Sequence, residues 1–93
     1  AMWRMLQANT PADFVIATGT THSVRELCEL AFGELDLNYQ DYVRVNPEFV
    51  RAHETVQLVG NPAKALRVLD WQARTPFAEL VKMMVHADLK DLA

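Results

Sequence analysis

A short run near the middle of the chain gathers three side chains that could do chemistry. Arg51, His53 and Glu54 place a guanidinium, an imidazole and a carboxylate close together, between two stretches that favour β-structure. An arginine fork matches phosphate oxygens in bidentate fashion, and a carboxylate can accept hydrogen bonds from the vicinal hydroxyls of a ribose. Loops on a rigid scaffold often carry such groups. Spacing alone nevertheless favours an exposed Arg–Glu pair worth under about 1 kcal/mol.

Standard catalytic and metal-binding patterns are absent from the sequence. It holds no Gly-x-Gly-x-x-Gly turn, no phosphate-binding P-loop and no His-Glu-x-x-His pair. The histidines His22, His53 and His86 are scattered, which favours surface or capping roles over metal ligation. The single cysteine, Cys28, excludes a disulfide framework and a multi-thiolate zinc site, and we expect it to be a small core side chain.

Length and composition describe an ordinary globular chain. The 93 residues are 51% apolar and 23% charged, with a net charge of −3. No apolar run approaches the roughly 20 residues of a membrane span, and no basic block favours nucleic acid. We therefore expect a cytoplasmic protein without membrane or nucleic-acid partners.

The start of the chain predicts a helix without a capping residue. Residues 1–7 favour a helix, and Met2, Trp3 and Leu6 share one of its faces. A helix usually begins after Ser, Thr, Asp or Asn. We expect a helix cut in its middle by truncation from a longer protein; the alternative is a tag remnant followed by an initiator methionine.

Three stretches predict strands. The apolar run at residues 14–17 lies between turn residues, as is typical of a strand buried on both faces. Weak alternation at residues 42–45 and a β-favouring run at 55–59 predict two more strands.

Two further helices have recognisable starts. Ser23 and Glu26 form a capping box, in which the hydroxyl accepts from the Glu26 amide and the carboxylate reaches back to the Ser23 amide. The helix that follows covers residues 24–35. Asn61 as N-cap and Pro62 at the first helical position predict a shorter helix.

The last helix is predicted to begin at Thr75 as capping residue, with Pro76 at the first helical position. Its apolar side would carry Phe77, Leu80, Val81, Met84 and Leu89 or Leu92. The methionine and aromatic side chains on helices are expected in the core: Met2, Trp3, Phe77, Met83 and Met84. The fold class is therefore α/β, or α+β-like, with short strands and about four helices.

The order of these pieces resembles the GDP-mannose 4,6-dehydratases. Residues 14–26 resemble the family stretch YVIATG-xx-HSVREF, and residues 1–7 are similar to the AMWLMLQ helix that precedes it. Arg51-x-x-Glu54, followed by residues 60–65, resembles the family pattern RPxEVDxLxGDPSKA. The resemblance covers essentially the whole chain.

The resemblance implies an extended short-chain dehydrogenase/reductase, a lyase of GDP-fucose biosynthesis. Such an enzyme converts GDP-mannose into GDP-4-dehydro-6-deoxymannose with bound NADP. Residues 1–93 would be its C-terminal substrate-binding domain, without the cofactor-binding Rossmann domain or any catalytic residue. The isolated chain is therefore expected to be inactive, and the parent enzyme to be a homo-oligomer.

At the matching positions, the resemblance implies that Arg51 contacts the diphosphate of the substrate and that Glu54 contacts its ribose hydroxyls. It therefore favours a binding site over a surface ion pair. Ala52 and His53 replace the family's Pro-Thr or Pro-Ala, which would loosen the loop. Asp70 replaces a glycine, so that a left-handed backbone there would carry strain.

Two alternatives stay open at this point. The chain could belong to another nucleotide-sugar epimerase, dehydratase or reductase, or it could be a non-catalytic interaction module that stands alone. In the full family fold, the strand at residues 14–17 and the first helix would pack against upstream structure, so the isolated chain would expose Met2, Trp3 and this strand as an apolar patch. Such patches promote association, so we expect self-association.

Overall fold

The computed structural model of the chain describes residues 1–52 and 56–93, and it divides into two compact units. The first unit consists of Ala1–Thr21 and Val56–Arg74. The second unit consists of His22–Thr55 and Thr75–Ala93, of which 53–55 lie outside the described residues. Each unit therefore combines two separate stretches of the sequence.

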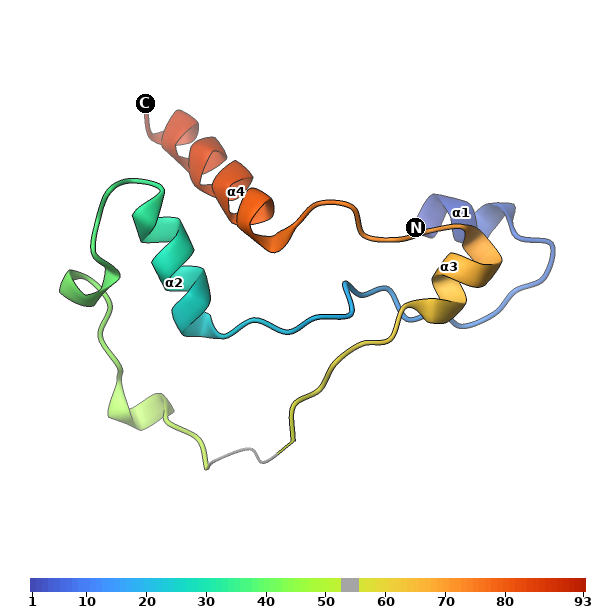
Figure 1. The fold of residues 1–93 in the computed structure, drawn as a ribbon, viewed down its shortest axis with the longest axis horizontal. Coiled ribbons are helices and arrows are strands. Elements are labelled where there is room, and N and C mark those ends of the chain that lie inside the picture. The colour runs from blue at the N-terminus through green and yellow to red at the C-terminus, as the bar shows by residue number, and fades with distance from the viewer. Residues whose placement is uncertain (53–55) are drawn as a thin grey trace. The chain divides into compact units, whose positions relative to one another are not determined.

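Four α-helices and two 3-10 turns make up the regular structure of the described residues (Figure 1). The first unit holds α1 (Met2–Gln7) and α3 (Ala63–Leu69). The second unit holds α2 (Val24–Gly33), α4 (Phe77–Leu92) and the turns η1 (Tyr39–Asp41) and η2 (Pro47–Phe49). The prediction of four helices is confirmed.

In the first unit, α3 is held at both of its ends. The Asn61 Oδ1 atom accepts a hydrogen bond from the Ala63 amide at 3.0 Å. The helix nevertheless begins one residue later than predicted, because Pro62 and not Asn61 is its N-cap residue. At the other end Asp70 is left-handed, with φ of 51°. The Arg4 guanidinium of α1 donates to the carbonyl of Leu69 at 3.0 Å and to that of Asp70. Arg4 therefore ties α1 to carbonyl groups that the helix itself leaves free.

The segment before α2 lies against the start of α3. Gly60 approaches it so closely that a Cβ atom at this position would lie 2.5 Å from the Ala17 Cβ atom. The Lys64 ammonium donates to the Asp13 carbonyl at 2.8 Å and lies 5.1 Å from the centroid of the Phe14 ring. These contacts fix residues 13–17 without any β-ladder.

The predicted strands are wrong for the described residues. Residues 14–17, 42–45 and 56–59 have irregular structure. A strand must satisfy its backbone groups on a neighbouring strand, and none of the described segments offers one. At residues 42–45 a turn also competes with strand formation, because the Val43 amide donates to the Tyr39 carbonyl at 2.8 Å.

In the second unit, α2 begins at the predicted cap. The Ser23 hydroxyl accepts a hydrogen bond from the Glu26 amide at 3.1 Å. The second half of the capping box was predicted wrongly, because the Glu26 carboxylate lies 3.0 Å from the His22 Nδ1 atom and not on the Ser23 amide. The i, i+4 spacing makes these two side chains neighbours.

The helices α2 and α4 pack side by side in the second unit (Figure 1). Val81 of α4 is buried, with 3% of its surface exposed. At one end of the pair, the rings of His22 and Phe77 stack with centroids 3.9 Å apart. At the other end, the His86 Nε2 atom lies 2.8 Å from the Glu34 carboxylate. The apolar contact is thus flanked by a histidine at either end.

The start of α4 differs from the prediction. Pro76 is itself the N-cap residue, with an extended backbone, and no side chain caps the helix. Thr75 is therefore not the capping residue. The amides of the first turn of α4 therefore receive no side-chain cap from the N-cap residue.

The core is smaller than the sequence predicts. Only three apolar side chains of the described residues are buried: Ala65, Leu69 and Val81. Several expected core residues are exposed instead: Met2, Trp3, Leu80, Met83 and Met84. The chain exposes 8290 Å², whereas two compact units of these sizes would together expose about 6,600 Å². Each helix packs along one side, and its opposite side is not covered by a second layer of the described residues.

The left-handed Asp70 gives a stability prediction. Asp70→Gly should stabilise the first unit by about 0.5–1 kcal/mol, because glycine adopts this backbone conformation without steric strain. Asp88→Gly, within α4, should instead destabilise the second unit. Urea unfolding followed by circular dichroism measures both; a lower midpoint for Asp70→Gly would contradict the first expectation.

Candidate functional site

The candidate site lies directly after the turn η2. The Asn46 Oδ1 atom accepts from the Glu48 amide at 3.0 Å, and Pro47 occupies the first position of the turn. The Val50 amide then donates to the Pro47 carbonyl at 3.3 Å. This turn leads the chain directly into Arg51.

Two arginines in this part of the chain have different environments. The Arg44 guanidinium donates to the carbonyl of Gln40 at 2.9 Å, so it stabilises the local backbone. Arg51 is exposed, and no described residue accepts a hydrogen bond from its guanidinium. Glu54 and His53 lie outside the described residues. Whether Arg51 and Glu54 come together therefore stays a prediction.

An exposed arginine after a short turn can bind an anion. Its five N–H donors form a planar fork that two oxygens of a phosphate or carboxylate can occupy together. Among residues 1–52 and 56–93, no group of three or more His, Cys, Asp or Glu side chains could hold a metal ion. The described helices are also too short or too polar to cross a membrane.

Two histidine–carboxylate contacts of the second unit were not predicted from the sequence. His22 and Glu26 are four residues apart, a spacing that could have predicted their contact. The contact of Glu34 with His86 joins residues 52 positions apart, so no local pattern could have predicted it. Both contacts belong to the α2–α4 pair, and neither involves a residue of the candidate site.

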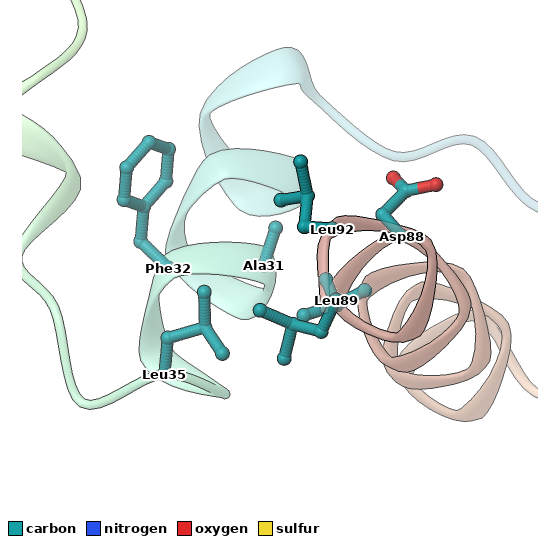
Figure 2. A pocket seen from close by; sticks show the side chains of 7 residues that line it. Ala31, Phe32, Leu35, Asp88, Leu89 and Leu92 are labelled. Carbon is teal, nitrogen blue, oxygen red and sulfur yellow. The ribbon is translucent and has the colours of Figure 1, made fainter.

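A second feature of this unit is an apolar groove between α2 and α4 (Figure 2). Its volume is about 220 Å³. It is lined by residues of α2, of the turn that follows it and of α4: Ala31, Phe32, Leu35, Val85, Asp88, Leu89 and Leu92. The sequence places these residues on two helix faces but gives no reason to bring the faces together.

Comparison with known proteins identifies similar sequences over nearly the whole chain. The family profile described as GDP-mannose 4,6 dehydratase matches residues 1–84. A Dictyostelium discoideum protein named GDP-mannose 4,6 dehydratase is 44% identical over 97% of this chain. Proteins named for the same activity from Arabidopsis thaliana and Homo sapiens are 44% and 39% identical over the same share. The chain spans 30%, 24% and 29% of the lengths of these relatives.

Proposed function

Because the chain belongs to the GDP-mannose 4,6 dehydratase family, we propose that it forms the nucleotide-sugar-binding part of a longer dehydratase. That enzyme would convert GDP-mannose into GDP-4-dehydro-6-deoxymannose. The observation that carries the proposal is the family match over residues 1–84, which includes the candidate site. The chain's share of its relatives' length agrees with a role as one part of such an enzyme.

Arg51 and Glu54 have complementary roles in this proposal. The Arg51 guanidinium donates two parallel hydrogen bonds to the diphosphate and offsets part of its negative charge. The Glu54 carboxylate accepts from the two ribose hydroxyls. Both contacts lie on the nucleotide, so they position the substrate and take no part in the reaction at the sugar.

The residues of this chain do not fit a binding site for NADP. The three glycines, Gly19, Gly33 and Gly60, are too far apart to form a Gly-x-Gly-x-x-Gly turn. NADP and the groups that transfer protons would therefore belong to another part of the enzyme.

The exposed apolar segments support the same proposal. Val15 and Ile16 are exposed, as are Val56, Leu58 and Val59. β-Branched and leucine side chains in extended segments are typical of strands in a buried sheet. Strands from the rest of the enzyme would give these segments the backbone partners that the described residues do not supply.

Titration of the ¹⁵N-labelled chain with GDP-mannose tests the binding role. We expect weak binding, in about the millimolar range, with the largest shifts at the Arg51 side chain and in the turn η2. UDP- and dTDP-sugars serve as matched competitors, and they should bind more weakly. Equal binding of all three would favour another nucleotide-sugar enzyme; shifts elsewhere in the chain would overturn the assignment of the site.

Incubation with GDP-mannose and NADP tests whether this chain binds the substrate without catalysing the reaction. The purified chain should give no turnover, because the proposal assigns the catalytic set to another part of the enzyme. Formation of any 4-keto-6-deoxy sugar nucleotide would contradict this expectation.

A further inference from the structure

Two short turns of the second unit share one arrangement, in which an asparagine side chain begins the turn. In η1 the Gln40 amide donates to the Asn38 Oδ1 atom at 3.1 Å. In η2 the Glu48 amide donates to the Asn46 Oδ1 atom at 3.0 Å. The two asparagines also have nearly the same backbone conformation, with φ of −91° and −88° and ψ of 115° in both. The two turns therefore begin in the same way.

An arginine follows each turn, and the two arginines have different partners. Arg44, after η1, donates to the Gln40 carbonyl at 2.9 Å and to the Val43 carbonyl at 3.2 Å. Arg51 follows η2, and among the residues that the structure describes it has neither a carbonyl to which it donates nor a carboxylate with which it pairs. The guanidinium of Arg44 thus holds its own backbone, whereas no described group competes with a ligand for that of Arg51.

The turn η2 restrains the backbone that leads to Arg51. The Phe49 amide donates to the Asn46 carbonyl at 3.0 Å, and the next amide donates to the Pro47 carbonyl at 3.3 Å. Proline also fixes its own φ near about −65°. Val50 then leaves the turn with an extended backbone, at φ of −72° and ψ of 119°. The side chain of Asn46 adds the cap that begins this set of restraints.

We propose that Asn46 is a positioning residue for the diphosphate of the nucleotide sugar and that it acts through Arg51. This inference rests on the proposed function, in which Arg51 contacts the diphosphate. By capping η2, Asn46 limits the directions in which the backbone enters Arg51, and so raises the fraction of molecules whose guanidinium is placed to bind. The apparent affinity for the ligand falls in proportion when that fraction falls. Asn46 itself makes no contact with the substrate.

Replacement of Asn46 tests this role in the NMR titration with GDP-mannose. Asn46→Ala should raise the dissociation constant about three- to tenfold, less than Arg51→Ala does, because the guanidinium is still present. Asn46→Ser should restore most of the affinity, since a serine hydroxyl can also accept a hydrogen bond at a cap position. Asn38→Ala removes the equivalent cap from η1 and is the matched control, so its affinity should equal that of the unchanged chain. Circular dichroism confirms that each variant keeps its helices.

A double-mutant cycle distinguishes a positioning role from a direct contact or a general loss of structure. If Asn46 acts only through Arg51, Asn46→Ala should change the affinity by no more than about twofold once residue 51 is already alanine. The initial slopes of the titration curves compare such weak affinities. An equal loss in both backgrounds, an equal loss for Asn38→Ala, or no rescue by Asn46→Ser would overturn the proposal.

Failure of the proposed function gives a different result. Arg51→Ala would then bind GDP-mannose as tightly as the unchanged chain, and the inference would fall with the role of Arg51. If Arg51→Ala weakens binding and Asn46→Ala does not, only the positioning role of Asn46 is wrong.

Discussion

Replacement of Gly60 by alanine is expected to unfold the first unit. The added Cβ atom would lie 2.5 Å from the Ala17 Cβ atom, and a Cβ atom cannot move without its backbone. The backbone around Ala17 is itself held by the bond from Lys64 to the Asp13 carbonyl. Overpacking of this kind costs about 2–3 kcal/mol, a large share of the stability of a small unit. Both tryptophans lie in the first unit, so their fluorescence reports its unfolding directly.

Two controls separate this steric clash from a general effect of replacing glycine. Gly33→Ala adds a methyl group where no atom lies within 4 Å, and in α2 it should stabilise by about 0.5–1 kcal/mol. Ala17→Gly combined with Gly60→Ala moves the methyl group across the contact and should restore most of the lost stability. Unchanged fluorescence and an unchanged urea midpoint for Gly60→Ala alone would show that the two segments are not packed in this way.

Replacement of Arg51 by alanine is expected to reduce the affinity for GDP-mannose about 10- to 100-fold. Hydrogen bonds to charged groups contribute about 1.5–3 kcal/mol, and the substitution removes a bidentate set. Arg51→Lys keeps the positive charge but loses the planar fork. Its affinity for GDP-mannose should therefore lie between those of the unchanged chain and the Arg51→Ala variant. The measurement is the same NMR titration used for the unchanged chain.

Arg67→Ala is the matched control, because Arg67 is also exposed and lies on α3, outside the candidate site. Its affinity should match that of the unchanged chain. If Arg51→Ala and Arg67→Ala weaken binding equally, the effect is one of overall charge and Arg51 has no specific role.

The local features of the fold were predictable from the sequence. The cap at Ser23 is confirmed, and Asn61 accepts from the Ala63 amide beside the start of α3, although Pro62 is the N-cap residue there. The cap predicted at Thr75 is wrong. Each of these features depends on residues within a few positions along the chain, because a capping side chain reaches only the first turn of its own helix. The family was predictable as well, since its motifs follow one another in order through residues 1–84.

The features that depend on distant partners were not predictable in the same way. Residues 14–17 have the composition of a strand, but a strand forms only beside another strand, and the described residues provide none. Met84 lies on the apolar side of α4 that the sequence predicts, yet it is exposed, whereas Val81 on the same helix is buried. Periodicity identifies an apolar face without saying what will cover it.

The candidate site is predictable only as far as its residue types. Arg51 is accessible and follows a short capped turn, as anion binding requires. The roles of Arg51 and Glu54 come from the family resemblance and stay predictions. Spacing could not choose between a binding site and an ion pair, because both use the same two side chains at the same separation.

The interleaved arrangement of the two units sets the order in which they can fold during synthesis. Arg4 can donate to the Leu69 carbonyl only after 65 further residues have been synthesised. Glu34 can contact His86 only after 52 further residues. The first unit is complete once Arg74 has left the ribosome, whereas the second needs the last helix of the chain. During synthesis, α1 and α2 are therefore exposed together until the residues that pack against them have been added, and such exposed apolar surface is prone to aggregate.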